Sequence, residues 1–158
     1  MAVAALITWV ITAILGATML RKWVSGGGLA AARADAAGTA EAAPGTTAGG
    51  GTAPGGAAPG SAGATSFPPG VVFGHFLVVV AGLVVWIIYF AVDNDVLTWV
   101  AFATLIVGAV LGDVMFLRWR KSGSGTESRL PRQLVYPHGV FAVITIILVL
   151  LAALGVGS

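Results

Sequence analysis

The sequence predicts an all-α membrane protein, a bundle of four transmembrane helices made of two parallel helix-pair repeats with a disordered linker rich in Gly, Ala and Pro. Only 9% of the 158 residues are charged and 58% are hydrophobic, whereas a soluble domain carries about 25% charged residues. The apolar residues come in blocks of about 20, enough to cross a hydrocarbon core of about 30 Å. The blocks also fall into two halves of similar sequence. These observations predict a multi-pass protein whose main partner is the lipid bilayer.

The chain contains no cysteine, which excludes disulfides, thiolate metal sites and cysteine nucleophiles. Its eight lysines and arginines all flank apolar blocks instead of forming a basic domain, so we expect no nucleic-acid partner. The sequence also has no nucleophile elbow, no HExxH motif and no phosphate-binding loop. We therefore name no catalytic residue and no metal ligand of these kinds, and we expect a protein that is not an enzyme.

The first segment, residues 1–24, is predicted to be a transmembrane helix whose apolar run covers about residues 2–20. Its positive charges, Arg21 and Lys22, follow that run, whereas a secretory signal carries them in front of it. We therefore expect a span that is retained in the membrane.

The next segment, residues 25–66, consists almost entirely of Gly, Ala, Pro, Thr and Ser. Such a composition cannot bury enough apolar surface to offset the entropy lost on ordering, so we predict a disordered cytoplasmic linker. Alanine favours helix in the stretch GLAAARADAAG, but alanine alone does not make that helix stable.

The last segment, residues 67–158, contains three further predicted spans. They cover about residues 71–92, 96–117 and 139–155. The final span can also begin earlier, at Pro131, with a kink at Pro137.

The basic residues predict the orientation of the four spans. All eight lie in the stretches 21–33 and 118–132, which four crossings place on one side of the membrane. The other side carries both termini and the acidic turn at residues 93–95. Because cytoplasmic loops carry the excess of Lys and Arg, we expect the basic side in the cytoplasm and both termini outside.

The two halves of the chain match around its only two histidines. Residues 67–80 (FPPGVVFGHFLVVV) align with residues 130–143 (LPRQLVYPHGVFAV), which places His75 on His138. Each histidine lies seven residues after a proline and opens an apolar run. The first spans of the two halves match as well, because AILGATMLRKW and AVLGDVMFLRW share the pattern LGxxM…W. We therefore predict a parallel duplication with a pseudo-two-fold axis along the membrane normal.

A small-residue motif recurs in the matching first spans. Thr12 and Gly16 in the first half correspond to Gly108 and Gly112 in the second half. Small residues four apart let helix backbones approach closely. We therefore predict that Gly16, Gly108 and Gly112 contribute to helix packing.

Three ionisable groups are predicted to lie inside the cytoplasmic leaflet: His75, His138 and Asp113. Ionisable groups at this depth are costly and usually face the bundle interior. Two neutral imidazoles from facing helices can ligate one haem iron, so His75 and His138 are candidate axial ligands of a haem b. In this hypothesis the glycines beside the histidines leave room for the porphyrin and arginines at the interface meet its propionates. These residues are Gly74, Gly139, Arg118, Arg129 and Arg132.

Two other interpretations stay open. The histidines can be interfacial caps that bond a loop carbonyl or face the headgroups, and duplication then explains why the feature occurs twice. Alternatively, His75, Asp113 and His138 can form a His–Asp–His cluster that conducts protons or ions.

Three stretches of the chain carry a family resemblance: MAVAALITWVITAILG, FPPGVVFGH…GLVVWIIY and HGVFAVITIILVLLAALGVG. They resemble a group of small, uncharacterised four-span membrane proteins of high-GC Gram-positive bacteria. The resemblance covers all four spans and leaves out the linker. It implies an integral protein of the bacterial inner membrane and implies no activity. The working prediction is a small non-enzymatic protein, an accessory or assembly component that packs against a copy of itself or within a larger membrane complex.

Overall fold

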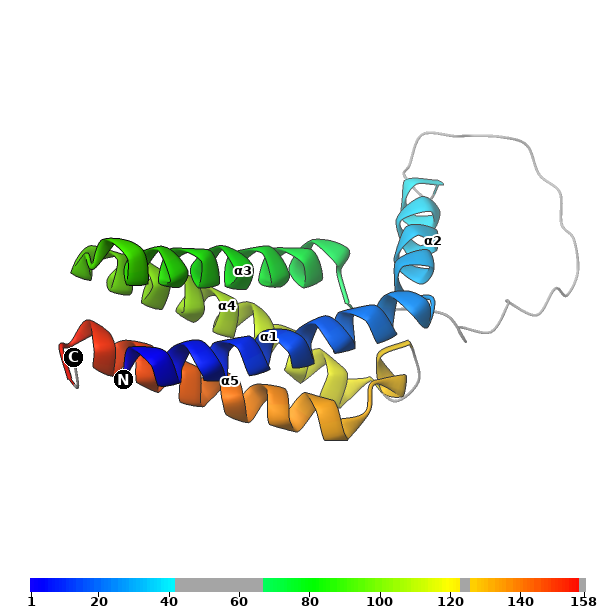
Figure 1. Cartoon of the computed structure of the whole chain (residues 1–158). Helices are drawn as coiled ribbons and strands as arrows, with labels where there is room; N and C mark the ends of the chain where they lie inside the picture. The colour runs from blue at the N-terminus through cyan, green and yellow to red at the C-terminus, as the bar shows by residue number, and fades with distance from the viewer. Residues whose placement is uncertain (42–66, 123–125, 157–158) are drawn as a thin grey trace, which may run out of the picture.

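The computed structural model describes residues 1–41, 67–122 and 126–156, and throughout these residues the chain is helical, without strands (Figure 1). Within the described residues, four helices are long and apolar enough to cross a membrane. The helices are α1 (Ala2–Ser25), α2 (Gly28–Glu41), α3 (Pro69–Val92), α4 (Asp95–Lys121), the short 3-10 helix η1 (Thr126–Arg129) and α5 (Arg132–Ala153). The predicted all-α class with four long apolar helices is confirmed.

The same local chemistry starts the second helix of each repeat. Pro68 precedes α3 and Pro131 precedes α5, both in extended conformation. Proline has no backbone N–H, so it fits at the start of a helix, where that donor would have no partner within the helix. Helix α3 ends at Asp93, which adopts a left-handed conformation (φ 51°), and the side chain of Asn94 then accepts a hydrogen bond from the backbone N–H of Val96. This two-residue connection turns α4 back along α3.

Helix α5 begins earlier than the predicted span at residues 139–155. It starts at Arg132 and continues through Pro137 to Ala153. Proline removes a single backbone donor, and membrane helices tolerate this loss when their neighbours compensate. The structure therefore agrees with the earlier of the two predicted starts, at Pro131. The apolar run marks only the part of the helix that spans the hydrocarbon core.

The first part of the predicted linker is helical. Residues Gly28–Glu41 form α2, which stands across the direction of the bundle in Figure 1. The bend between α1 and α2 uses Gly27, whose φ of +90° favours glycine. The start of α2 packs on α1, because Leu29 lies against the cluster around Trp23 and Ala32 is buried. This tertiary contact supplies stabilisation that the helix propensity of alanine alone does not give. The rest of the predicted linker, residues 42–66, lies outside the described residues.

The four long helices pair across the two repeats. Helix α3 packs most extensively on α4, and α5 packs most extensively on α1. The second helix of each repeat therefore lies against the first helix of the other repeat. Both ends of the described chain lie at one end of the bundle, and the α4–α5 connection lies at the other end (Figure 1). We call the latter the basic end, after Arg21, Lys22, Arg118, Arg120, Lys121, Arg129 and Arg132.

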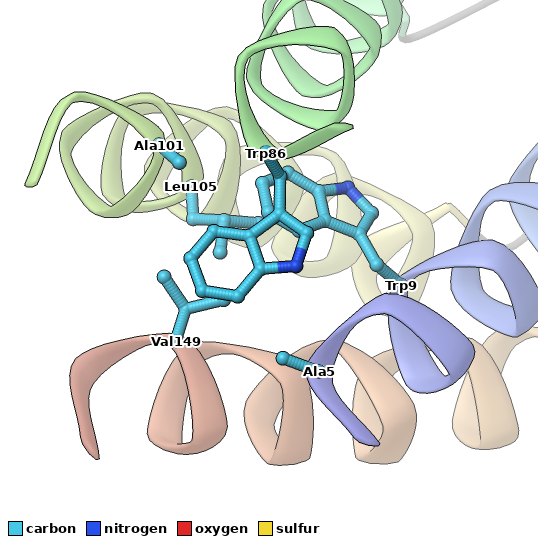
Figure 2. Close-up of a cluster of buried hydrophobic side chains, with 6 residues drawn as sticks. All are labelled: Ala5, Trp9, Trp86, Ala101, Leu105 and Val149. Atoms are coloured by element: carbon cyan, nitrogen blue, oxygen red, sulfur yellow. The ribbon is translucent and has the colours of Figure 1, made fainter. Parts of the chain in front are cut away.

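The core near the chain termini consists of residues related by the duplication (Figure 2). We call it the termini-end cluster. When the alignment of the repeats is extended along the helices, its buried members form three matched pairs: Ala5 with Ala101, Trp9 with Leu105, and Trp86 with Val149. The indoles of Trp9 and Trp86 pack with ring centroids 6.3 Å apart. Matched positions that meet at one centre are the packing expected of a pseudo-two-fold axis, and the predicted parallel duplication is confirmed.

A second core lies nearer the basic end. We call Trp23, Phe67, Val72 and Leu130 the basic-end cluster. The partly buried side chains packed against it include the repeat-related pair Met19 and Met115. Tertiary packing thus joins the two repeats at two levels.

The outer surface of the bundle is apolar. Only 11–17% of the most hydropathic part of each long helix is buried inside the monomer. Large aliphatic side chains such as Val3, Leu77 and Val143 are more than half exposed. An apolar exterior on this scale fits contact with lipid.

Candidate functional site: the histidine pair

The two histidines meet inside the bundle. Their ring centroids are 6.3 Å apart, with the ring planes inclined at 64°. His75 belongs to α3 and His138 to α5, and both side chains are half-buried. On α3, Val72 of the basic-end cluster and Val79 at the edge of the termini-end cluster lie on either side of His75. The imidazole pair is therefore a polar layer between two apolar cores.

Each imidazole is held by a helix of the other repeat. Nδ1 of His75 lies 2.8 Å from the backbone oxygen of Gly108 on α4. Nδ1 of His138 lies 3.0 Å from the backbone oxygen of Thr12 on α1. Because a carbonyl only accepts hydrogen bonds, Nδ1 is the protonated nitrogen in both rings. In the neutral imidazole, Nε2 then keeps its lone pair and is the nitrogen able to bind a metal.

The glycines of the small-residue motif receive these rings. A Cβ on Gly16 would lie 3.0 Å from Cε1 of His138, and a Cβ on Gly112 would lie 3.3 Å from Cε1 of His75. Gly108 has a different neighbour, since its Cβ would lie 2.6 Å from Val79 of α3. The motif therefore brings α3 close to α4 at Gly108, whereas at Gly16 and Gly112 it lets an imidazole lie on the helix backbone.

The glycines next to the histidines play no such part. A Cβ on Gly74 or on Gly139 would meet no atom within 4 Å. These two glycines therefore adjoin open space and do not support an imidazole, and the expectation that they leave room for a porphyrin stays a prediction. The residues that flank the imidazoles come from the opposite repeat instead.

Asp113 is not part of the pair. Its side chain is exposed on α4, whereas both imidazoles are half-buried. The structure therefore brings two of the three predicted ionisable groups together and leaves the third exposed on the outer surface of the bundle. The interfacial-cap interpretation also differs from the observed bonds, because the acceptors at Thr12 and Gly108 lie within helices and not in loops. Arg118, Arg129 and Arg132 are exposed at the basic end.

The sequence did not predict three contacts between helices or loops around the histidine pair. The hydroxyl of Thr145 donates to the hydroxyl of Thr8 at 3.0 Å, and the repeat-related contact brings Gly82 against Thr104. Glu127 of η1 is fully buried, and its Oε1 accepts a hydrogen bond of 3.1 Å from the backbone N–H of Phe67. The only available signal for Glu127 was its position as a single acidic residue within a basic loop.

The donor set is small. Across the described ranges, no group of three or more His, Cys, Asp or Glu side chains is arranged to hold a metal ion. The imidazole pair offers two nitrogen donors on a pseudo-two-fold axis. This arrangement matches a cofactor that needs only two protein ligands. It also matches a metal ion that binds further side chains other than His, Cys, Asp and Glu.

The fold and the site together define the class of the protein: it is a multi-pass integral membrane protein of four transmembrane helices with a histidine pair inside the bundle. No protein-family model, curated protein or solved structure matches the chain. The resemblance to small four-span proteins of high-GC Gram-positive bacteria stays a prediction.

Proposed function

We propose that the protein is a membrane-embedded electron carrier that binds one haem b, with His75 and His138 as the two axial ligands. The porphyrin would supply four nitrogen donors of its own, so the haem would need only the two imidazoles from the protein. Haem iron supplies one-electron redox chemistry, and the protein supplies position and environment.

The observation that carries the proposal is the spacing of the rings. An imidazole nitrogen binds a metal ion at about 2 Å, and the ring centre lies about 1 Å farther out. Two imidazoles on opposite sides of one iron therefore have ring centres roughly 6 Å apart. The centroids of His75 and His138 are 6.3 Å apart.

The hydrogen bonds at Nδ1 support the same assignment. Metal-ligating histidines usually donate their other ring N–H to a carboxylate or backbone carbonyl, which fixes the tautomer and the ring orientation. Both imidazoles make this bond, to Gly108 and to Thr12. Close packing on Gly16 and Gly112 limits the rotation of each ring further.

The orientation of the carrier belongs to the same proposal. The positive-inside rule places the basic end in the cytoplasm of a bacterial cell and both termini outside. The histidine pair then lies in the cytoplasmic half of the inner membrane. The broader prediction of a non-enzymatic accessory or assembly component is the function that remains if no haem is bound.

The test is the absorption spectrum of the detergent-purified protein from cells supplied with haem. We expect a Soret band and the sharp visible bands of six-coordinate haem, and we expect both His75→Ala and His138→Ala to lose them. Asp113→Asn is the matched control, because Asp113 lies outside the pair, and it should keep the spectrum. Colourless wild-type protein that takes up no added haem would rule out the proposal, as would a spectrum that survives both histidine variants.

A further inference from the structure

The histidine pair has a second pair of potential ligands one helical turn away. Besides Met1, the chain has two methionines, Met19 on α1 and Met115 on α4. The alignment of the repeats matches them to each other. Both are partly buried and pack against the same basic-end cluster. Two equivalent thioethers therefore flank the pseudo-two-fold axis, as the two imidazoles do.

The methionines share a helix face with the glycines that receive the imidazoles. Met19 follows Gly16 by three residues, and Met115 follows Gly112 by three residues. Residues three apart on a helix are neighbours on one face. Since His138 lies on Gly16 and His75 lies on Gly112, each methionine begins one turn from an imidazole, on the side of the basic end.

The directions of the side chains bring the two layers together. Helical side chains incline toward the N-terminus of their own helix. Helices α1 and α4 run toward the basic end, so Met19 and Met115 incline back toward the histidine layer. Helices α3 and α5 run the opposite way (Figure 1), so His75 and His138 incline toward the methionine layer. The two pairs of donors therefore incline toward each other along the bundle.

The geometry points to an intramembrane Cu(I) site with ligands His75, His138, Met19 and Met115. Thioether sulfur and imidazole nitrogen are the donors that favour Cu(I), whereas carboxylate and water suit Mg²⁺ and Ca²⁺. Structural zinc sites use thiolates, imidazoles and carboxylates, and the chain has no cysteine.

Charge favours the monovalent ion as well. All four ligands are neutral, so the site holds the full charge of the metal inside an apolar bundle. Burying a single charge costs less than burying a double charge, because the solvation energy of an ion rises with the square of its charge. The inference uses the same two imidazoles as the proposed haem site but does not depend on haem binding. The two occupants exclude each other, because each requires both Nε2 atoms.

The test is a Cu(I) titration of the haem-free, detergent-purified full-length protein, under reducing and oxygen-free conditions, against a chromogenic Cu(I) chelator. We expect one Cu(I) per chain. The double variant Met19→Leu with Met115→Leu should weaken binding at least tenfold, and each single histidine variant should weaken it as strongly. Leucine nearly conserves the volume of methionine, so the bundle should keep its thermal stability. Val114→Leu, at an exposed position beside Met115, is the matched control and should bind as the wild type does.

X-ray absorption of the copper-loaded wild type gives a second readout that needs no variant. We expect both nitrogen and sulfur scatterers around the copper, and a heavier scatterer in protein labelled with selenomethionine. A wild type that takes up no Cu(I), a methionine double variant with unchanged affinity, or a shell of nitrogen alone would each overturn the inference. The methionine double variant should keep any haem spectrum, so failure of the copper site and failure of the haem proposal are separate results.

Discussion

Adding one methyl group at Gly16, which lies under the imidazole of His138, should destabilise the bundle. Adding one at Gly139, which follows His138 in the chain, should stabilise it. In Gly16→Ala the new Cβ lies 3.0 Å from Cε1 of His138, well inside the usual carbon–carbon contact of about 3.5–4.0 Å. In Gly139→Ala the new Cβ meets nothing within 4 Å. Both variants add one methyl group near His138. Gly16→Ala adds it on α1, directly under the imidazole, whereas Gly139→Ala adds it on α5, where it meets no other atom.

The magnitudes follow from three effects. Overpacking by one methyl group costs about 1–3 kcal/mol, and displacing His138 also strains its hydrogen bond to Thr12, a bond worth roughly 0.6 kcal/mol inside a membrane. Replacing a helical glycine with alanine contributes about 1 kcal/mol in the other direction. We therefore expect Gly16→Ala to lower the free energy of unfolding by about 0.5–2.5 kcal/mol and Gly139→Ala to raise it by up to about 1 kcal/mol.

The repeat supplies a second, graded comparison. A Cβ on Gly112 would lie 3.3 Å from His75, a looser contact, so Gly112→Ala should cost less than Gly16→Ala. Its matched control is Gly74→Ala. The assay is reversible unfolding of each variant in mixed detergent micelles, followed by tryptophan fluorescence or circular dichroism. If Gly16→Ala proves at least as stable as Gly139→Ala, then the imidazole does not lie on the helix backbone and the described site is wrong.

Two further variants test the contacts around the site. Gly82→Ala should lower the free energy of unfolding by about 2 kcal/mol or more, because its Cβ would overlap the hydroxyl of Thr104. Adding Thr104→Ala should restore only part of the loss, because the new Cβ would still lie 3.1 Å from Trp9 and from the Cβ of residue 104. Additive losses in the double variant would contradict the contact. Glu127→Ala should lower the free energy of unfolding by about 1–3 kcal/mol, because the backbone N–H of Phe67 loses its buried acceptor. The exposed Gln133→Ala is the control in the same assay. A loss no larger than that of the control would show that the Glu127 carboxylate does not stabilise the contact between η1 and the start of α3.

The apolar pattern was sufficient to predict the elements of the fold. Blocks of about 20 apolar residues have few alternatives in a bilayer, since a spanning segment must satisfy its own backbone hydrogen bonds. The positions of α1, α3 and α4 follow from this rule, and so does the match between the repeats. The polar first turns of α5 did not follow from this rule, although a start at Pro131 was one of the two predicted. A backbone that water or headgroups can reach requires no apolar pattern.

The start of α2 shows why local composition was not enough. Its residues are mostly Gly and Ala, which argued for a disordered linker. Leu29 and Ala32 nevertheless pack at the end of α1. A short helix of weak propensity is stabilised mainly by tertiary contact, and such contacts cannot be read from the segment alone.

The sequence by itself determined that this chain is a membrane protein, that it contains two copies of a helix pair, and that its two histidines occupy equivalent positions. Only the tertiary structure decided which helices exchange partners, so that α3 lies on α4 and α5 lies on α1, and which glycines support the imidazoles. The physical reason is that hydrophobicity drives each span into lipid but does not distinguish one apolar neighbour from another. Among apolar helices, steric fit at small residues and single hydrogen bonds choose the partner, and those depend on side chains far apart in the sequence.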